Sequence, residues 1–418
     1  MSKNHTKRTI LAAATAALLA IAVLASAGAA APALHAARTQ TTQLISQARD
    51  GGIPNGPSTN PVISGDKRYA RVIAFESEAS DLVGGDTNGT KDVFAVKRSG
   101  SFANVGTAWH GGNATLLSRG LGGQPANGPS FAPSVDGAYR SDPRCVAFLS
   151  AASNLVKGDT NGVTDAFISR GPGGKLRRVS KPGNHQAGQP TTAVAVAGDC
   201  SRVAFVTGGR LYTRSHEKTK SLGSKGGDAA NPSFAAGEGT DLVFDAGGDI
   251  YLSRDGTHKP KKVAGGGRNP AYNALKRHVL SYEKHAGGHW QIAWRELGHG
   301  GEHIASSAGS HLGNGDSRHP SVANSGYYIG FETEASNLGT NAARAKKDDN
   351  GRPDTYLYTG VRDLTLVQDV KEYGVPVNGG GHNPSISYYA NYFVFDSPAP
   401  LNHPFGPRQI FMRWLGTV

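Results

Sequence analysis

The sequence predicts an all-β protein in which seven repeats of short strands close into a ring. Three observations predict it. The 418-residue chain holds 57 Gly and 22 Pro, a composition typical of short strands joined by turns. A Pro-Ser turn, a hydrophobic strand and a strand with an aromatic pair recur along the chain. The last repeat lacks its final strand, and a strand without a repeat of its own stands near the start.

The repeats are clearest in three stretches. "NPVISGDKRYARVIAFESEASDLV" from Asn60 matches "APSVDGAYRSDPRCVAFLSAASNLV" from Ala132 and "HPSVANSGYYIGFETEASNL" from His319. Weaker relatives begin at Gln189, Asn231, Asn269 and Asn383. The chain from residue 41 therefore divides into seven units of about 54 residues, within the range of four-stranded propeller blades.

Each unit continues into a strand such as "DVFAVK", "DAFISR" or "DIYLSR", and most have a further strand such as "TLLS" or "KKVA". The "VAF"-type strands are apolar on both sides, as expected for sheets packed between two neighbours. We therefore expect these strands to place six phenylalanines inside the blades: Phe75, Phe148, Phe205, Phe244, Phe331 and Phe395.

The seventh unit reaches Val418 before its last strand, whereas "TTQLIS" from Thr41 precedes the first unit. An N-terminal strand that completes the last C-terminal unit would close a radial array and remove its open edge. We predict that this segment pairs with "QIFMRW" as the outer strand of the seventh blade.

The order P-S, VAF-S, D-(I/V)-(Y/F), R-V-S resembles the TolB-type, WD40-like β-propeller repeat, and the resemblance covers residues 41–418. It implies a single propeller domain over residues 38–418, with four antiparallel strands in each blade. TolB-like propellers often have six blades, so seven units depart from that pattern.

Residues 1–37 are interpreted as a secretory signal peptide and short leader. Lys3, Lys7 and Arg8 precede an uncharged Ala- and Leu-rich run at 10–27, and small residues follow it. A retained membrane anchor is the alternative, because the run is long enough to span a bilayer. We expect a secreted protein, extracellular or at the cell envelope, that is monomeric and has no membrane span in its mature chain.

The only two cysteines, Cys145 and Cys200, lie in the part expected to be exported, where thiols tend to oxidise. Both flank "VAF" strands of successive units, so a disulfide bracing blades two and three is predicted. A pair of free thiols is the alternative.

The motif Asp-x-Asn-Gly-x-x-Asp occurs three times. Calcium is commonly held by Asp, Asn and backbone carbonyls of one short Gly-bearing loop, so these loops are candidate sites for weak, structural Ca²⁺. The alternative is a tight hairpin turn whose polar side chains bind no metal, since Asn-Gly is the preferred pair for such a turn. The candidate ligands, with the third of each set acting through its carbonyl, are Asp86, Asn88, Thr90 and Asp92; Asp159, Asn161, Val163 and Asp165; and Asp348, Asn350, Arg352 and Asp354.

The formal net charge of +12 favours an acidic partner, either an unidentified protein or an anionic cell-surface polymer. A solvated basic face that serves only solubility is the alternative. The sequence contains no Lys/Arg run with interleaved aromatic residues, which is the pattern that would indicate nucleic-acid binding. A Gly-x-Ser-x-Gly elbow is absent. The pairs His285/His289 and His299/His303 lie in Gly-rich segments that we expect to be loops.

The sequence thus favours a binding and interaction scaffold, and it offers no catalytic residue and no cofactor other than Ca²⁺. The alternative is an extracellular hydrolase or lyase acting on polysaccharide or peptide at the mouth of the central channel. Acidic or His side chains that converge there with perturbed pKa values would favour the enzyme.

Overall fold

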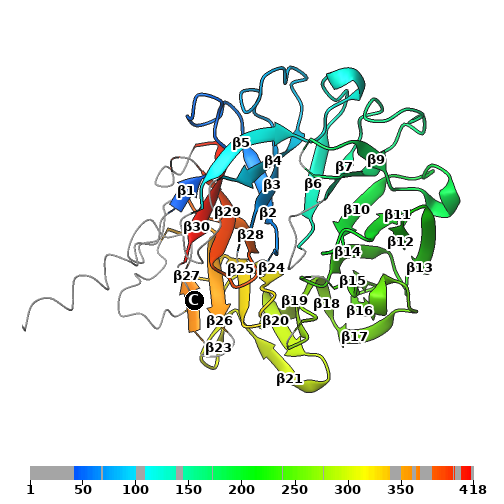
Figure 1. Cartoon of the computed structure of the whole chain (residues 1–418). Helices are drawn as coiled ribbons and strands as arrows, with labels where there is room; N and C mark the ends of the chain where they lie inside the picture. Colours follow the sequence, from blue (N-terminus) through cyan, green and yellow to red (C-terminus); the bar gives the residue numbers. More distant parts are fainter. Residues whose placement is uncertain are drawn as a thin grey trace, which may run out of the picture. The chain divides into compact units, whose positions relative to one another are not determined.

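Seven four-stranded antiparallel sheets make up the structure, which is a computed structural model (Figure 1). It describes residues 42–66, 69–99, 109–137, 145–171, 173–237, 239–275, 277–338, 350–359, 364–367, 379–398, 400 and 406–415. The predicted signal peptide lies outside the described residues. Residues 42–418 form one unit, a seven-bladed β-propeller as predicted, and its described part has no α-helix.

The blades follow one another along the chain. Blade one has β2 (Ser58–Ile63), β3 (Val72–Ser77), β4 (Asp92–Arg98) and β5 (Gly111–Leu116). Blade two has β6 (Ser130–Val135), β7 (Val146–Ser150), β8 (Asp165–Ser169) and β9 (Leu176–Arg178). Blade three has β10 (Thr191–Val196), β11 (Val203–Thr207), β12 (Arg210–Ser215) and β13 (Lys218–Gly223). Blade four has β14 (Ala229–Phe234), β15 (Leu242–Ala246), β16 (Asp249–Ser253) and β17 (Lys261–Gly265).

The remaining blades use the other half of the chain. Blade five has β18 (Gly267–Tyr272), β19 (Val279–Ala286), β20 (His289–Glu296) and β21 (His299–Ile304). Blade six has β24 (Ser317–Val322), β25 (Tyr328–Thr333), β26 (Asp354–Thr359) and β27 (Leu364–Val367). Blade seven has β28 (His382–Ile386), β29 (Tyr392–Pro398), β30 (Arg408–Trp414) and β1 (Thr42–Leu44). Smaller elements are the hairpin β22 (Ser307–Ala308) and β23 (His311–Leu312), and the 3₁₀ turns η1 (Leu121–Gly123), η2 (Pro182–Asn184) and η3 (Arg254–Gly256).

The ring closes as the sequence predicts. β1 pairs antiparallel with β30, with Thr42 opposite Arg413 and Leu44 opposite Phe411. Ser46 extends the closure beyond the strand, because its Oγ donates to Gln409 Oε1 at 2.7 Å and accepts from the Ile410 N–H at 3.0 Å. The two ends of the propeller are therefore held in one sheet.

The predicted phenylalanines form the core between blades. All six are buried, and each faces an aromatic ring on the third strand of its own blade at centroid distances of 5.4–6.1 Å. The partners are Phe94, Phe167, Tyr212, Tyr251, Tyr356 and Phe411. Paired rings fill the space between twisted sheets, which explains why the aromatic pairs recur with the repeat.

The first strand of each blade lies nearest the ring axis. β2, for example, contacts β6 and β28, the first strands of both neighbouring blades. At one end of the ring the turns after the first strands meet: Asn324 Nδ2 of blade six donates to Gly65 O of blade one at 3.1 Å. A side chain at Gly137 would come within 3.1 Å of the Gly65 backbone, so glycine permits this approach. The opposite end carries the loops between second and third strands.

A disulfide joins blades two and three, as predicted. Cys145 precedes β7 and Cys200 lies in the turn between β10 and β11, with an S–S distance of 2.05 Å and a Cα–Cα distance of 6.1 Å. Both residues are buried.

Of the two loop predictions, the one for "HGGEH" is wrong, and the one for "HAGGH" holds only for its two central glycines. "HGGEH" is the exposed strand β21, and "HAGGH" is the turn of the β19–β20 hairpin and its flanking strand residues. Gly-rich sequence predicts a loop, but backbone pairing with β20 stabilises β21, and the His303 ring stacks on Trp294 with ring centroids 4.7 Å apart. In the described residues, no helix is long and apolar enough to cross a bilayer.

Candidate functional site

The Asp-x-Asn-Gly loops connect the second and third strands of blades one, two and six. They lie at the end of the ring opposite the turns that follow the first strands. Their glycines, Gly89, Gly162 and Gly351, have φ between +63° and +68°. The preceding Asn side chain caps each turn, since its Oδ1 accepts a backbone N–H two residues later, from Thr90, Val163 or Arg352. Asp348 lies outside the described residues, and Asp354 is buried at the start of β26.

In blade one the loop is anchored by its last carboxylate. Asp92 is buried and accepts hydrogen bonds from Ser118 Oγ at 2.5 Å and Asn88 Nδ2 at 2.6 Å. Asn88 Nδ2 also donates to Ala126 O, ahead of blade two, at 3.2 Å. Burial, together with the nearby charge of Asp86, raises the pKa of Asp92 to about 6 against those two hydrogen bonds. The two carboxylates therefore lie close enough to repel.

Blade two repeats the arrangement with one change. Asn161 Nδ2 donates to Asp165 Oδ2 at 2.8 Å and to Ala187 O at 3.0 Å. The guanidinium of Arg178 contacts both loop carboxylates, at 2.7 Å from Asp159 Oδ1 and 3.3 Å from Asp165 Oδ2. In the equivalent register position of blade one, opposite Phe94, stands Leu116. A protein cation thus separates the carboxylates in blade two, and a leucine replaces it in blade one.

In blades five and seven a glutamine stands in place of the anchoring Asp, that is, of Asp92 in blade one and Asp165 in blade two. Gln291 and Gln409 take its place, and each accepts from a serine, Ser306 or Ser46. Their Nε2 atoms donate at 2.8 Å to carbonyls that lead into the next blade, those of Gly313 and Gly56. In blades five and seven the glutamine therefore links the blade to the next one, and in blades one and two the Asp and Asn together perform this role.

Among the described residues, one group brings together three metal-type ligands, Asp136, Cys145 and Cys200, and its sulfurs form the disulfide. The blade-one loop brings Asp86, Asn88 and Asp92 together, and the Asn88 amide nitrogen faces Asp92.

A second latch surrounds the mouth of the channel at the same end. In five blades a carboxylate follows the core aromatic of the second strand: Glu76, Asp245, Glu283, Glu332 and Asp396. Each accepts the backbone N–H of a left-handed residue in the first strand of the next blade, in turn Ala132, Asn269, His319, Asn383 and Asn60, at 2.9–3.4 Å. Leu149 and Val206 hold this position in blades two and three, where the latch is missing.

One member of this latch is a histidine. His319 Nδ1 contacts Glu332 Oε2 at 3.0 Å, and His382 Nδ1 contacts Oε1 of the same carboxylate at 3.1 Å. Burial opposes ionisation of Glu332, but the two histidines lower its pKa well below the usual range. Burial lowers the pKa of His319, but Glu332 and Glu283 outweigh it and raise that pKa. Acidic and His side chains with perturbed pKa values thus converge at the mouth.

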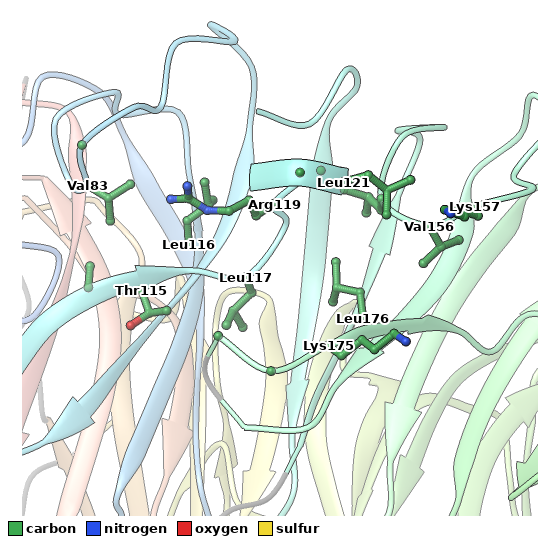
Figure 2. Close-up of a pocket in the computed structure, with 17 residues that line it drawn as sticks. Val83, Thr115, Leu116, Leu117, Arg119, Leu121, Val156, Lys157, Lys175 and Leu176 are labelled. Carbon is green, nitrogen blue, oxygen red and sulfur yellow. The ribbon is translucent and has the colours of Figure 1, made fainter. Parts of the chain in front are cut away.

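A groove lies between blades one and two on the outer side of this end, with a volume of about 920 Å³ (Figure 2). Leu117, Leu155 and Leu176 give it an apolar floor and wall. The turn η1 covers it, held by a hydrogen bond from the Leu121 N–H to Asn154 O at 2.9 Å. An adjoining hollow of about 400 Å³, lined also by Arg49, shares Val83 and Gly84.

Three exposed cations stand at the groove: Arg119, Lys157 and Lys175. Neither lysine makes an ion pair with a described residue. Sequence reasoning missed all three, because they come from loops of two different blades and share no motif. Only the fold brings them together.

Solved structures share the fold at low sequence identity. An oligogalacturonate lyase in complex with manganese is 10% identical, with a TM-score of 0.52 over 90% of this chain and 96% of that chain. A prolyl endopeptidase structure is 10% identical, with a TM-score of 0.51 over 88% of this chain and 48% of that chain. A putative TolB from Agrobacterium tumefaciens is 11% identical, with a TM-score of 0.39 over 69% of this chain and 91% of that chain.

The lyase and endopeptidase structures confirm the β-propeller fold and no more, since a fold hosts many functions. No protein-family model matches the chain, and no curated protein matches its sequence.

Proposed function

We propose that the protein is a secreted binding module whose groove between blades one and two takes an acidic, partly apolar segment of a partner protein. The observation that carries this proposal is the combination of an apolar floor with Arg119, Lys157 and Lys175 beside it. A groove of this volume lies in the size range of sites that enclose a ligand of some tens of atoms. Apolar side chains of the segment would occupy the floor, and its carboxylates would contact the cations.

A peptide fits the lining better than a sugar does. No aromatic side chain is among the residues that line the groove, although aromatic rings commonly supply the flat surfaces on which sugar rings pack. Leucines instead favour branched aliphatic side chains. The chain's own N-terminal segment is a poor occupant, because residues 1–41 carry four Lys and Arg and no Asp or Glu.

Secretion is part of the proposal. The disulfide between Cys145 and Cys200 is typical of oxidising compartments outside the cytosol. The charged leader and apolar run before residue 38 would direct the export.

The test is binding of a fluorescent peptide that alternates Leu with Asp and Glu, followed by anisotropy. We expect Lys157→Glu/Lys175→Glu to weaken binding about 5- to 30-fold, since reversing two exposed charges removes roughly 1–2 kcal/mol. The matched control, Lys218→Glu/Lys220→Glu, changes the same charge on β13 away from the groove and should bind as the parent does. Equal loss in both variants would refute a site in the groove.

We also propose that the blade-one loop binds Ca²⁺ weakly. The observation that favours it is Leu116, which leaves Asp86 and Asp92 without the ion-paired guanidinium that Arg178 supplies in blade two. Burial raises the pKa of Asp86, although the charge of Arg119 acts on this carboxylate and opposes the rise in part. Asp86 and Asp92 would hold the ion with the Thr90 carbonyl, and Asn88 would turn its oxygen inward. The ion would offset the repulsion between the two buried carboxylates.

With a dissociation constant of 10⁻⁴–10⁻³ M, typical of extracellular modules, 10 mM Ca²⁺ should add about 1.4–2.7 kcal/mol and raise Tm by about 2–3 °C. Asp86→Asn should abolish the rise. Leu116→Arg should abolish it as well while raising Tm without Ca²⁺. An unchanged parental Tm would leave the loop as a latch alone.

An enzyme remains the second candidate, favoured by the convergence of His319, Glu332 and His382 at the channel mouth. The test substrates are oligogalacturonate and proline-containing peptides, the substrates that the neighbours' names suggest. His319→Asn preserves the latch, since Asn holds that position in blades one, four, five and seven, but it removes the imidazole. Parental turnover that is lost in this variant would support the enzyme, and no turnover by the parent would reject it.

A further inference from the structure

The outermost strands of three consecutive blades carry exposed cations. Arg177 on β9, Lys218 and Lys220 on β13, and Lys261 and Lys262 on β17 are all exposed, with exposed side-chain fractions of 47% for Arg177 and 54% for Lys262. These three strands are the fourth strands of blades two, three and four, and they succeed one another around the outer edge of the ring (Figure 1). We call these five residues the basic arc.

The outermost strands of the other four blades lack this character. β5, β27 and β1 contain no charged residue, and β21 contains a single acid, Glu302, with His299 and His303. A solvated surface that serves only solubility has no reason to gather its cations on adjacent strands of one side. The uneven distribution indicates a surface selected for contact.

Most of the arc is free of intramolecular ion pairs. Arg177 contacts Glu217, and Lys262 Nζ lies 2.7 Å from Asp249 Oδ2. Both pairs are exposed, and such pairs contribute little free energy, so a stronger anion displaces them easily. Lys218, Lys220 and Lys261 make no ion pair with a described residue. The arc therefore presents unneutralised charge to solvent.

We propose that the basic arc binds a linear acidic polysaccharide. A monomeric anion would meet the cations of only one strand, whereas a chain with a negative charge on each repeat can contact β9, β13 and β17 in succession. Lysine supplies four of the five charges, and its compact ammonium suits carboxylates without a fixed orientation. Binding of this kind is electrostatic and weakens with salt.

Nucleic acid fits the arc less well. The three strands present no aromatic ring on which a base could stack, which single-stranded nucleic acid sites usually provide. Duplex DNA is stiff over about 50 nm, so it would contact a convex edge over only a short length. A flexible glycan chain can follow the edge across three blades.

The experiment measures binding of fluorescently labelled polygalacturonate by anisotropy between 50 and 300 mM NaCl. We expect Lys218→Glu/Lys220→Glu/Lys261→Glu to weaken binding at least tenfold and to reduce the slope of log Kd against log salt, because three contacts are lost. Galacturonate monomer at the same uronate concentration should not compete, and neutral dextran should not bind.

Lys157→Glu/Lys175→Glu serves as the control, since it changes the peptide groove and leaves the arc intact, so failure of one proposal is distinguishable from failure of the other. Circular dichroism and Tm should show that the triple variant is folded, as all three side chains are exposed. Parental affinity in the triple variant would overturn the proposal. Tighter binding of single-stranded or duplex DNA than of polygalacturonate would overturn it in favour of nucleic acid.

Discussion

Removing the disulfide tests how blades two and three are held together. This interface lacks the carboxylate latch, because Leu149 stands where Glu76 and Glu332 stand in blades one and six. The bond between Cys145 and Cys200 closes a loop with a sequence separation of 55. The change to make is Cys145→Ala/Cys200→Ala.

The magnitude follows from the loop. For a closed loop of this length, the chain-entropy relation gives about 4 kcal/mol of stabilisation at 25 °C. An unfolding entropy of roughly 2.1 cal/mol/K per residue over about 370 residues amounts to about 0.8 kcal/mol/K. The expected decrease in Tm is therefore about 5 °C.

Calorimetry of the parent and variant under non-reducing conditions measures this decrease. Each single variant should match the double variant, since either substitution breaks the bond. Because Cys200 has φ of +61°, Cys145→Ala/Cys200→Gly should recover a few tenths of a kcal/mol by relieving backbone strain. A decrease below about 1 °C would refute the reasoning and show that other contacts hold the interface.

Three further perturbations follow from the same contacts. Arg178→Leu leaves Asp159 and Asp165 buried without a cation and should cost about 3 kcal/mol, read as a Tm decrease of about 4 °C; no decrease would mean that Arg178 is not needed between them. Glu332 has a lowered pKa, so its stabilisation is present above its ordinary value of 4.5 and is lost on acidification, whereas His319 has a raised pKa, so its contribution is present below 6.5 and is lost as pH rises. The free energy of unfolding of the parent should therefore exceed that of Glu332→Gln by the largest amount between pH 4.5 and 6.5. Denaturant midpoints measured across this range check it, and a difference that does not change with pH would contradict it. Deleting residues 1–47 removes β1 and Ser46 and should lower Tm well below that of a chain lacking only residues 1–40; equal Tm values would show that ring closure does not matter.

The local repeat explains why the fold could be predicted. Each blade needs a turn, a strand apolar on both faces and an aromatic pair. Residues such as Phe75 and Phe94 therefore predict a blade from a single unit of the sequence. Ring closure could be predicted for the same reason, because a missing strand at one end matched a surplus strand at the other. The disulfide could be predicted because its cysteines flank equivalent strands of adjacent units.

The Asp-x-Asn-Gly loops show the limit of such reasoning. Their turn geometry is local and was visible in the sequence, but their partners are not. Ser118 lies 26 residues beyond Asp92, and Arg178 lies between the two carboxylates in blade two, whereas Leu116 holds its position in blade one. Whether a buried carboxylate faces serine, arginine or a second carboxylate depends on a neighbouring strand, so the motif alone could not distinguish a latch from a cation site.

The sequence by itself determined the seven-bladed architecture and the closure by β1, because both depend on a pattern repeated along the chain. It predicted the pairing of Cys145 with Cys200, which the structure confirms, because these are its only two cysteines and they flank strands of successive units. Only the tertiary structure decided the groove, the carboxylates at the channel mouth and the basic arc. Arg119 and Lys175 come from different blades, and Arg177, Lys218 and Lys261 are separated by some forty residues each. Charges so far apart in the chain become one surface only when the sheets stack around an axis, since a strand's sequence specifies which face it buries and not which strand it will lie beside.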